Sequence, residues 1–125
     1  MSNGYLQVDV STARPEILIA RLLERAVTSI RSAREVDPAG EAAARTRAIA
    51  KALDIVSELR VALDLERGQE VARNLDAVYE FVNHQLLVAS IEPGDKALEA
   101  ALRPLEIVSG GWWEMCGIAR PEAPR

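Results

Sequence analysis

Few residues of this 125-residue chain have the types and spacing that chemistry needs, and its lone histidine is the first to consider. Glu80 and His84 are four residues apart, so on a helix they would share one face and could supply two metal ligands. Carboxylate-bridged bundles use Glu-x-x-His pairs instead, and no second pair is present to complete four ligands. We therefore expect no metal site, with His84 a partly exposed polar residue of a helix.

The single cysteine, Cys116, could be imagined beside His84 as a nucleophile and its base. It stands close to Trp112 and Trp113, however, and such a setting is typical of a packed, structural thiol. A lone cysteine forms no internal disulfide, which agrees with a reducing compartment. We expect no catalytic residue.

Cofactor, nucleic-acid and membrane roles find no support in the pattern. The Gly110-Gly111 pair has neither a preceding strand nor a following Lys-Ser/Thr, so it is no phosphate loop, and we expect no cofactor. The net charge is −4 and the basic residues are scattered, which argues against nucleic acid. No apolar run reaches the roughly 18 residues of a membrane span, and residues 1–10 lack a signal sequence. A cytoplasmic protein without membrane contact is predicted.

The elements that must position these residues are predicted to be helices. Proline and glycine fall between stretches whose apolar residues recur at steps of three and four. The predicted helices cover residues 15–35, 41–65, 69–90 and a fourth segment from Leu98 to Trp112 and beyond. Gly68 is expected to end the second of them. Short links predict an all-α, antiparallel four-helix bundle.

The fourth helix and the two ends of the chain are less regular. Pro104 removes an amide donor and Gly110 with Gly111 loosen the backbone, so a kink or break is expected there. We predict three regions along the chain: an extended N-terminal segment over residues 1–14, the helical bundle over 15–118 and a flexible tail over 119–125.

The second and third predicted helices carry more apolar surface than a bundle core needs. The residues beyond the main stripes are Ile55, Val61, Ala62, Leu65, Tyr79, Phe81, Leu87 and Val88. They could pack under the fourth helix and the loops. Alternatively, they could form an exposed groove that receives another apolar segment.

The N-terminal segment could lie along such a groove. Leu6, Val8 and Val10 alternate with polar residues, a period of two that suits an extended stretch. No sheet is predicted for it to join. We interpret it as a latch over the groove, anchored by Tyr5.

One stretch of the chain resembles a known family. Residues 58–81, from Glu58 to Phe81, resemble the EL-x3-LD-x-E-x-GGE-[IL]-A-x-NL-x2-LY-x-[YF] signature of the flagellar secretion chaperone family FliS. Tyr5 and residues 11–18 resemble the family's Tyr followed by TASP-x-x-L, and Trp112 or Trp113 takes the place of its C-terminal Trp.

The sequence also departs from the family pattern. Arg14 replaces the Ser or Thr before Pro15, which removes a usual N-cap. Residues 23–25 read Leu-Glu-Arg in place of Tyr-Asp-Gly, and His84 with Gln85 replaces two Arg.

The resemblance implies a four-helix-bundle chaperone that binds the disordered C-terminal region of flagellin in the cytosol. It would prevent premature polymerisation, assist flagellar type III export and have other flagellar regulators as further partners; the chain itself would be a monomer or weak homodimer. A self-associating structural or regulatory bundle without an export role is the alternative. The residues expected to bind the partner are Tyr5, Leu6, Val8, Ile55, Leu59, Ala62, Leu63, Val78, Tyr79, Val82 and Leu86.

Overall fold

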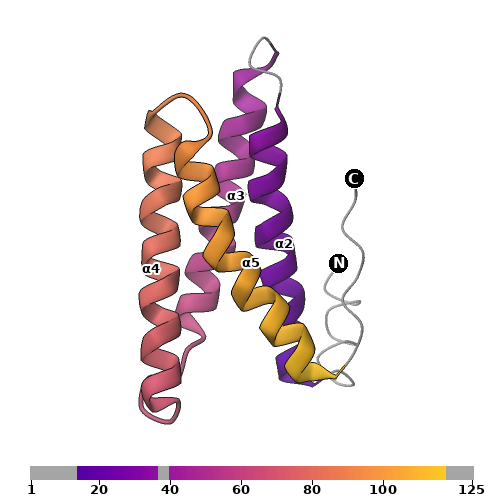
Figure 1. Ribbon diagram of the computed structural model, residues 1–125, viewed down its shortest axis with the longest axis vertical. Helices are drawn as coiled ribbons and strands as arrows, with labels where there is room; N and C mark the ends of the chain where they lie inside the picture. The colour runs from indigo at the N-terminus through magenta and orange to yellow at the C-terminus, as the bar shows by residue number, and fades with distance from the viewer. Residues whose placement is uncertain (1–13, 37–39, 118–125) are drawn as a thin grey trace.

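The computed structural model describes residues 14–36 and 40–117, and this part of the chain is built from helices alone. The helices are α2 (Pro15–Glu35), α3 (Ala42–Val61), α4 (Gln69–Ile91) and α5 (Lys96–Cys116) (Figure 1). The predicted all-α four-helix bundle is confirmed. The second helix ends at Val61 rather than at residue 65, because residues 62–68 form the connection to α4.

The four helices form a closed ring of contacts. α2 packs against α3 and α5, and α4 packs against the same two helices, so each helix has two neighbours. Short connections over residues 62–68 and 92–95 reverse the chain direction. α5 crosses the bundle obliquely, which brings its C-terminal end to the start of α2 (Figure 1).

The core consists of aliphatic side chains from all four helices together with one aromatic residue, Tyr79. Their spacing of three and four residues turns one stripe of each helix inward. A smaller cluster at the end of the bundle joins Ala20, Trp113 and Cys116. Cys116 is buried, as expected for a structural thiol.

A kink or a break is expected in the fourth helix, and of these the break is wrong. α5 is one continuous helix in which Pro104 is an internal residue. Pro104 lacks the N–H that would donate to the carbonyl of Ala100, but only that one bond is lost. Leu102 and Leu105 on either side of the proline are buried, so packing holds the helix together across it.

Charged side chains link neighbouring helices at the surface. Arg34 on α2 donates to Glu99 on α5 at 2.7 Å. One turn earlier on α2 and two turns later on α5, Arg31 pairs with Glu106. Between α3 and α4, Arg60 donates to Asp76 at 2.6 Å, and this hydrogen bond raises the pKa of the Arg60 guanidinium. These pairs fix the register of the helices more than they add stability, because they are partly exposed.

Several sequence-based expectations fall outside the described residues. The extended segment, apart from Arg14, and the tail over residues 119–125 belong to that group, and residues 37–39 are also not described. None of the helices in the described part of the chain is long and apolar enough to cross a membrane. Within the same residues, no group of three or more His, Cys, Asp and Glu side chains could hold a metal ion.

Candidate partner-binding site

The turn between α3 and α4 shapes one end of the bundle. Asp64 accepts a hydrogen bond from the Arg67 backbone N–H on its Oδ1 at 3.0 Å. Its carbonyl accepts another from the Gly68 N–H at 2.7 Å. This side-chain-to-backbone pairing is typical of an Asp that initiates a turn.

The sequence pattern predicts that Gly68 ends the second helix, and this prediction is wrong. It is the N-cap of α4 and has an ordinary φ of −75°. What requires glycine is space, since a Cβ here would lie 2.5 Å from the Cβ of Ala72 and 2.8 Å from the carbonyl oxygen of Asp64. The close approach lets the turn fold down onto the first turn of α4.

Gln69, the next residue, has a φ of +51°, which side chains other than glycine rarely adopt. It begins α4 at the position of the second glycine in the GGE part of the family signature. The chain therefore keeps the left-handed turn although its side chain costs conformational energy there.

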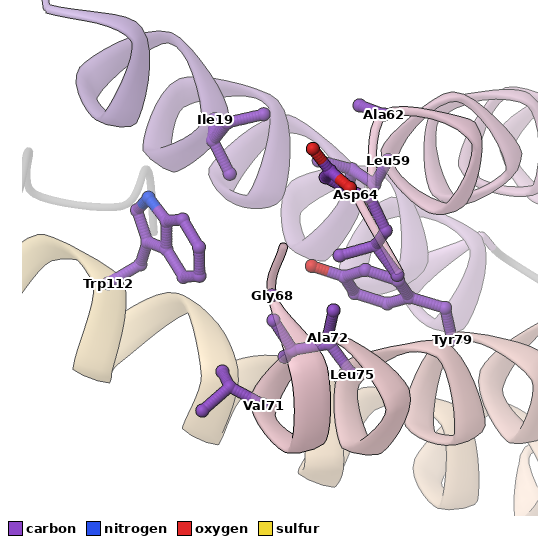
Figure 2. A pocket seen from close by; sticks show the side chains of 11 residues that line it. Ile19, Leu59, Ala62, Asp64, Gly68, Val71, Ala72, Leu75, Tyr79 and Trp112 are labelled. Atoms are coloured by element: carbon purple, nitrogen blue, oxygen red, sulfur yellow. The ribbon is translucent and has the colours of Figure 1, made fainter. Parts of the chain in front are cut away.

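A pocket of about 260 Å³ opens beside this turn (Figure 2). It lies between the end of α3, the first turns of α4, and residues of α2 and α5 that approach from the opposite side (Figure 2). The lining residues are Ile19, Leu59, Ala62, Leu63, Asp64, Gly68, Val71, Ala72, Leu75, Tyr79 and Trp112. Because Asp64 is the only charged residue among them, the pocket is suited to apolar side chains.

Trp112 forms the α5 wall of the pocket. Its ring is half-buried, and its indole N–H donates to the backbone carbonyl of Glu16 on α2 at 2.9 Å. Figure 2 shows the ring standing across the pocket from α4, with Ile19 next to it on α2. The hydrogen bond fixes the ring orientation, so the pocket keeps its shape without a partner.

Tyr79 forms the floor of the pocket and also belongs to the core. Only 1% of the residue is exposed, and burial raises the pKa of Tyr79 to about 12. The phenol is therefore neutral at neutral pH. Figure 2 shows the ring reaching from α4 with its hydroxyl directed into the pocket.

Exposed apolar residues surround this end of the bundle. Val71 lines the pocket and is 67% exposed. Val61, the last residue of α3, is 85% exposed, and Leu65 in the following turn is 49% exposed. Isolated exposed aliphatic residues are ordinary, but a cluster beside an apolar pocket is typical of an interaction site.

Some of the surplus apolar residues pack inside the bundle and others are exposed. Ile55 and Tyr79 are buried, as packing inside the bundle requires. Phe81 and Leu87 on α4 are exposed, together with Val61 and Leu65. Helical spacing alone cannot separate the buried residues from the exposed ones, because the exposure of a residue on α4 depends on how far α5 covers that helix.

The residues expected to bind the partner fall into three groups in the structure. Four of them line the pocket: Leu59, Ala62, Leu63 and Tyr79. Ile55, Val82 and Leu86 are buried in the core, and Val78 is partly buried against it. Tyr5, Leu6 and Val8 lie outside the described residues.

Sequence reasoning missed other lining residues. Ile19, Leu75 and Trp112 follow the core pattern of their helices, so nothing in the pattern separates them from residues deeper in the bundle. The sequence does not report the oblique path of α5, which leaves this end of the bundle open.

His84, the residue first considered for chemistry, is exposed on α4.

An antiparallel bundle with an open apolar pocket at one end defines a helical binding module. The family model described as "Flagellar protein FliS" matches residues 1–119, and the chain belongs to this family, which is a family of chaperones and not of enzymes.

Curated relatives cover most of the chain. The flagellar secretion chaperone FliSB of Pseudomonas aeruginosa is 33% identical over 107 residues, which are 86% of this chain and 85% of the relative. The flagellar secretion chaperone FliS of Salmonella typhimurium is 31% identical over 114 residues, 87% of this chain and 84% of that protein. FliS of Vibrio cholerae is 26% identical over 113 residues, 87% of this chain and 83% of that protein.

Proposed function

We propose that the protein is a cytoplasmic export chaperone that binds the disordered C-terminal region of flagellin, here called the client. Binding prevents premature polymerisation and assists flagellar type III secretion. Membership of the FliS family and the names of the relatives support the export role. The observation that carries the proposal is the preformed apolar pocket between the turn 62–68, α4 and Trp112.

The pocket is small enough to be filled by one or two side chains of a longer chain. Its volume of about 260 Å³ is below the roughly 300 to 1,000 Å³ of typical ligand clefts. An apolar side chain of the client would enter it, while Val61, Leu65 and Val71 would pack against the neighbouring turn of the client. This is the helix-in-groove mode of recognition, in which a few apolar anchors supply most of the binding energy.

Burial of the client's apolar residues would account for both parts of the chaperone role. Flagellin's terminal region polymerises by packing against other subunits, and residues held in the pocket are not available for that packing. The client is ordered only where it is bound, so ordering costs reduce the affinity that burial provides. Ile55, Val82 and Leu86 belong to the same buried core as the pocket residues Leu59 and Tyr79.

A filament-assembly assay with a matched pair of variants tests this function. The parent protein at equimolar concentration is expected to suppress elongation of filaments from purified flagellin monomers. Val71→Asp places a charge at the pocket and should abolish suppression, whereas Ile91→Asp makes the same change at an exposed position at the other end of α4 and should leave it intact.

The outcomes separate the proposal from its alternative. Suppression by neither the parent nor the control would contradict a chaperone role. A tight dimer at micromolar concentration that a flagellin peptide does not dissociate would favour the self-associating bundle instead. Equal suppression by both variants would place the client away from the pocket.

A further inference from the structure

The hydroxyl group of Tyr79 is the unexplained polar group of the pocket. Tyr79 as a whole residue is 1% exposed and makes no hydrogen bond with a described residue, yet its hydroxyl oxygen is not one of the fully buried atoms without a partner, which in the described part of the chain are Asn83 Oδ1 and Trp113 Nε1. The hydroxyl therefore still opens onto the pocket, where water or a bound group can pair with it. A phenylalanine ring at this position would fill the core equally well.

The direction of the hydroxyl shows where a partner could reach it. The surface around it is apolar apart from Asp64, and Figure 2 shows the hydroxyl directed into the pocket rather than toward the core. A group that enters the pocket can therefore meet it. The phenol is neutral and so carries a proton to donate.

We propose that the Tyr79 hydroxyl determines specificity by donating a hydrogen bond to a neutral acceptor of the bound client, next to the apolar side chain that fills the pocket. This inference rests on the proposed function and adds the chemistry of the recognised group. The acceptor is a carbonyl or hydroxyl oxygen, either from the client backbone at a helix end or from an Asn, Gln, Ser or Thr side chain.

Asp64 limits the acceptor to a neutral group. Its carboxylate lines the same pocket, and among the described residues it forms an ion pair with Arg67 at 3.8 Å, which is exposed and therefore weak. A carboxylate of the client would approach an existing negative charge in a partly desolvated place. A neutral oxygen avoids this repulsion and still satisfies the Tyr79 hydroxyl.

The Tyr79→Phe variant tests the inference because it removes the hydroxyl and keeps the ring. Its stability to urea should match that of the parent, because the lost group has no partner in the free protein. Its affinity for a synthetic peptide of the C-terminal region of flagellin from the same genome should fall about 5- to 10-fold. Ser90→Ala, which removes a hydroxyl at the far end of α4, should bind as the parent does.

Peptide variants then distinguish the two sources of the acceptor. Each Asn, Gln, Ser and Thr of the peptide is replaced in turn by Ala, and each peptide is titrated into the parent and into Tyr79→Phe. If one replacement removes the difference between the two proteins, that side chain is the acceptor. If the difference survives every replacement, the acceptor is a backbone carbonyl.

Three results would overturn the inference. If the parent binds the peptide and Tyr79→Phe binds equally well, the hydroxyl has no role although the proposed function stands. If the parent does not bind at all, the inference fails together with the function. If Tyr79→Phe is unstable, the hydroxyl proton of Tyr79 in the parent complex decides: a slowly exchanging NMR resonance that appears on binding is expected, and its absence would contradict the proposal.

Discussion

The indole N–H of Trp112 is joined to the carbonyl of Glu16 by a hydrogen bond of 2.9 Å that ties the end of α5 to the first turn of α2. A second link lies close by, where the Arg14 guanidinium donates to the carbonyl of Cys116. Arg14 thus does not cap α2 with its side chain but satisfies a free carbonyl at the C-terminus of α5, where a positive charge is favourable. Together the two links hold one wall of the pocket in place.

Replacing each of the two neighbouring tryptophans by phenylalanine should separate effects on client binding from effects on stability. Trp112→Phe loses a hydrogen bond and part of the pocket wall, so client affinity should fall and the free energy of unfolding should decrease by about 1 kcal/mol. Trp113→Phe leaves a cavity in the small cluster with Ala20, which should lower the free energy of unfolding by roughly 1 to 3 kcal/mol while affinity is kept. Equal client affinity of Trp112→Phe and the parent would show that this wall is not used.

Two glycine-to-alanine changes should have opposite effects on stability. Gly68→Ala forces a Cβ against Ala72 and the Asp64 carbonyl, which should lower the free energy of unfolding by roughly 1 to 3 kcal/mol. Gly111→Ala, inside α5, meets no atom within 4 Å and should raise it by up to about 1 kcal/mol through helix propensity. Urea titrations of both variants give the comparison. A Gly68→Ala protein as stable as the parent would show that the turn can relax without cost.

Much of the fold could be predicted from the sequence, because the spacing of apolar residues and the positions of proline and glycine report on helices directly. α2 begins and ends as predicted, at Pro15 and Glu35. The predicted alternative of a break at Pro104 is wrong, because the lost hydrogen bond is a local cost that the buried neighbours Leu102 and Leu105 offset.

The candidate site was harder to predict, because it depends on how the helices cross. Leu59, Ala62, Leu63 and Tyr79 were placed in it by the family signature and by apolar surplus. Trp112 contributes only because α5 runs obliquely, and no local pattern encodes a crossing angle. The positive φ of Gln69 could be predicted only from the family signature, which has a glycine at that position.

Alkaline pH should destabilise the protein through Tyr79. Its pKa is about 12 in the folded state against about 10 in an unfolded chain, so the folded state holds the proton more tightly. The contribution of the neutral phenol is complete below pH 10. As pH rises from about 10 to 12 the unfolded state is deprotonated first, and the free energy of unfolding should fall by up to about 2 kcal/mol.

The Tyr79→Phe variant supplies the reference for this prediction. Other groups titrate in the same range, but their effects are shared by both proteins and cancel in the difference. Urea unfolding at about pH 9 and about pH 11 should show a larger loss for the parent than for the variant. Identical losses would mean that the Tyr79 hydroxyl is accessible to water in the folded protein.

The N-terminal segment is predicted to be a latch that competes with the client for the pocket. Its alternating Leu6, Val8 and Val10 can bury one face, and Tyr5 would anchor it. Deletion of residues 1–10 should tighten peptide binding, since the closed fraction of molecules no longer reduces the apparent affinity. The free protein should also become less soluble with its apolar pocket uncovered.

Hydrogen exchange distinguishes the latch from a clamp. Amides of residues 5–12 should lose protection when the peptide binds if the segment is displaced. Weaker binding after the deletion, together with a gain of protection in the intact chain, would show instead that the segment closes over the bound client and forms part of the site.

Calorimetric titration at several temperatures tests most directly whether this bundle binds the C-terminal region of flagellin through apolar burial. The parent protein and the flagellin peptide should form a one-to-one complex whose binding enthalpy becomes more negative as temperature rises, since burial of apolar surface gives a negative heat-capacity change. Absence of any heat or mobility shift at tens of micromolar would contradict flagellin binding by this bundle. The binding free energy would then be smaller in magnitude than roughly 6 to 7 kcal/mol, which is too weak for a dedicated chaperone.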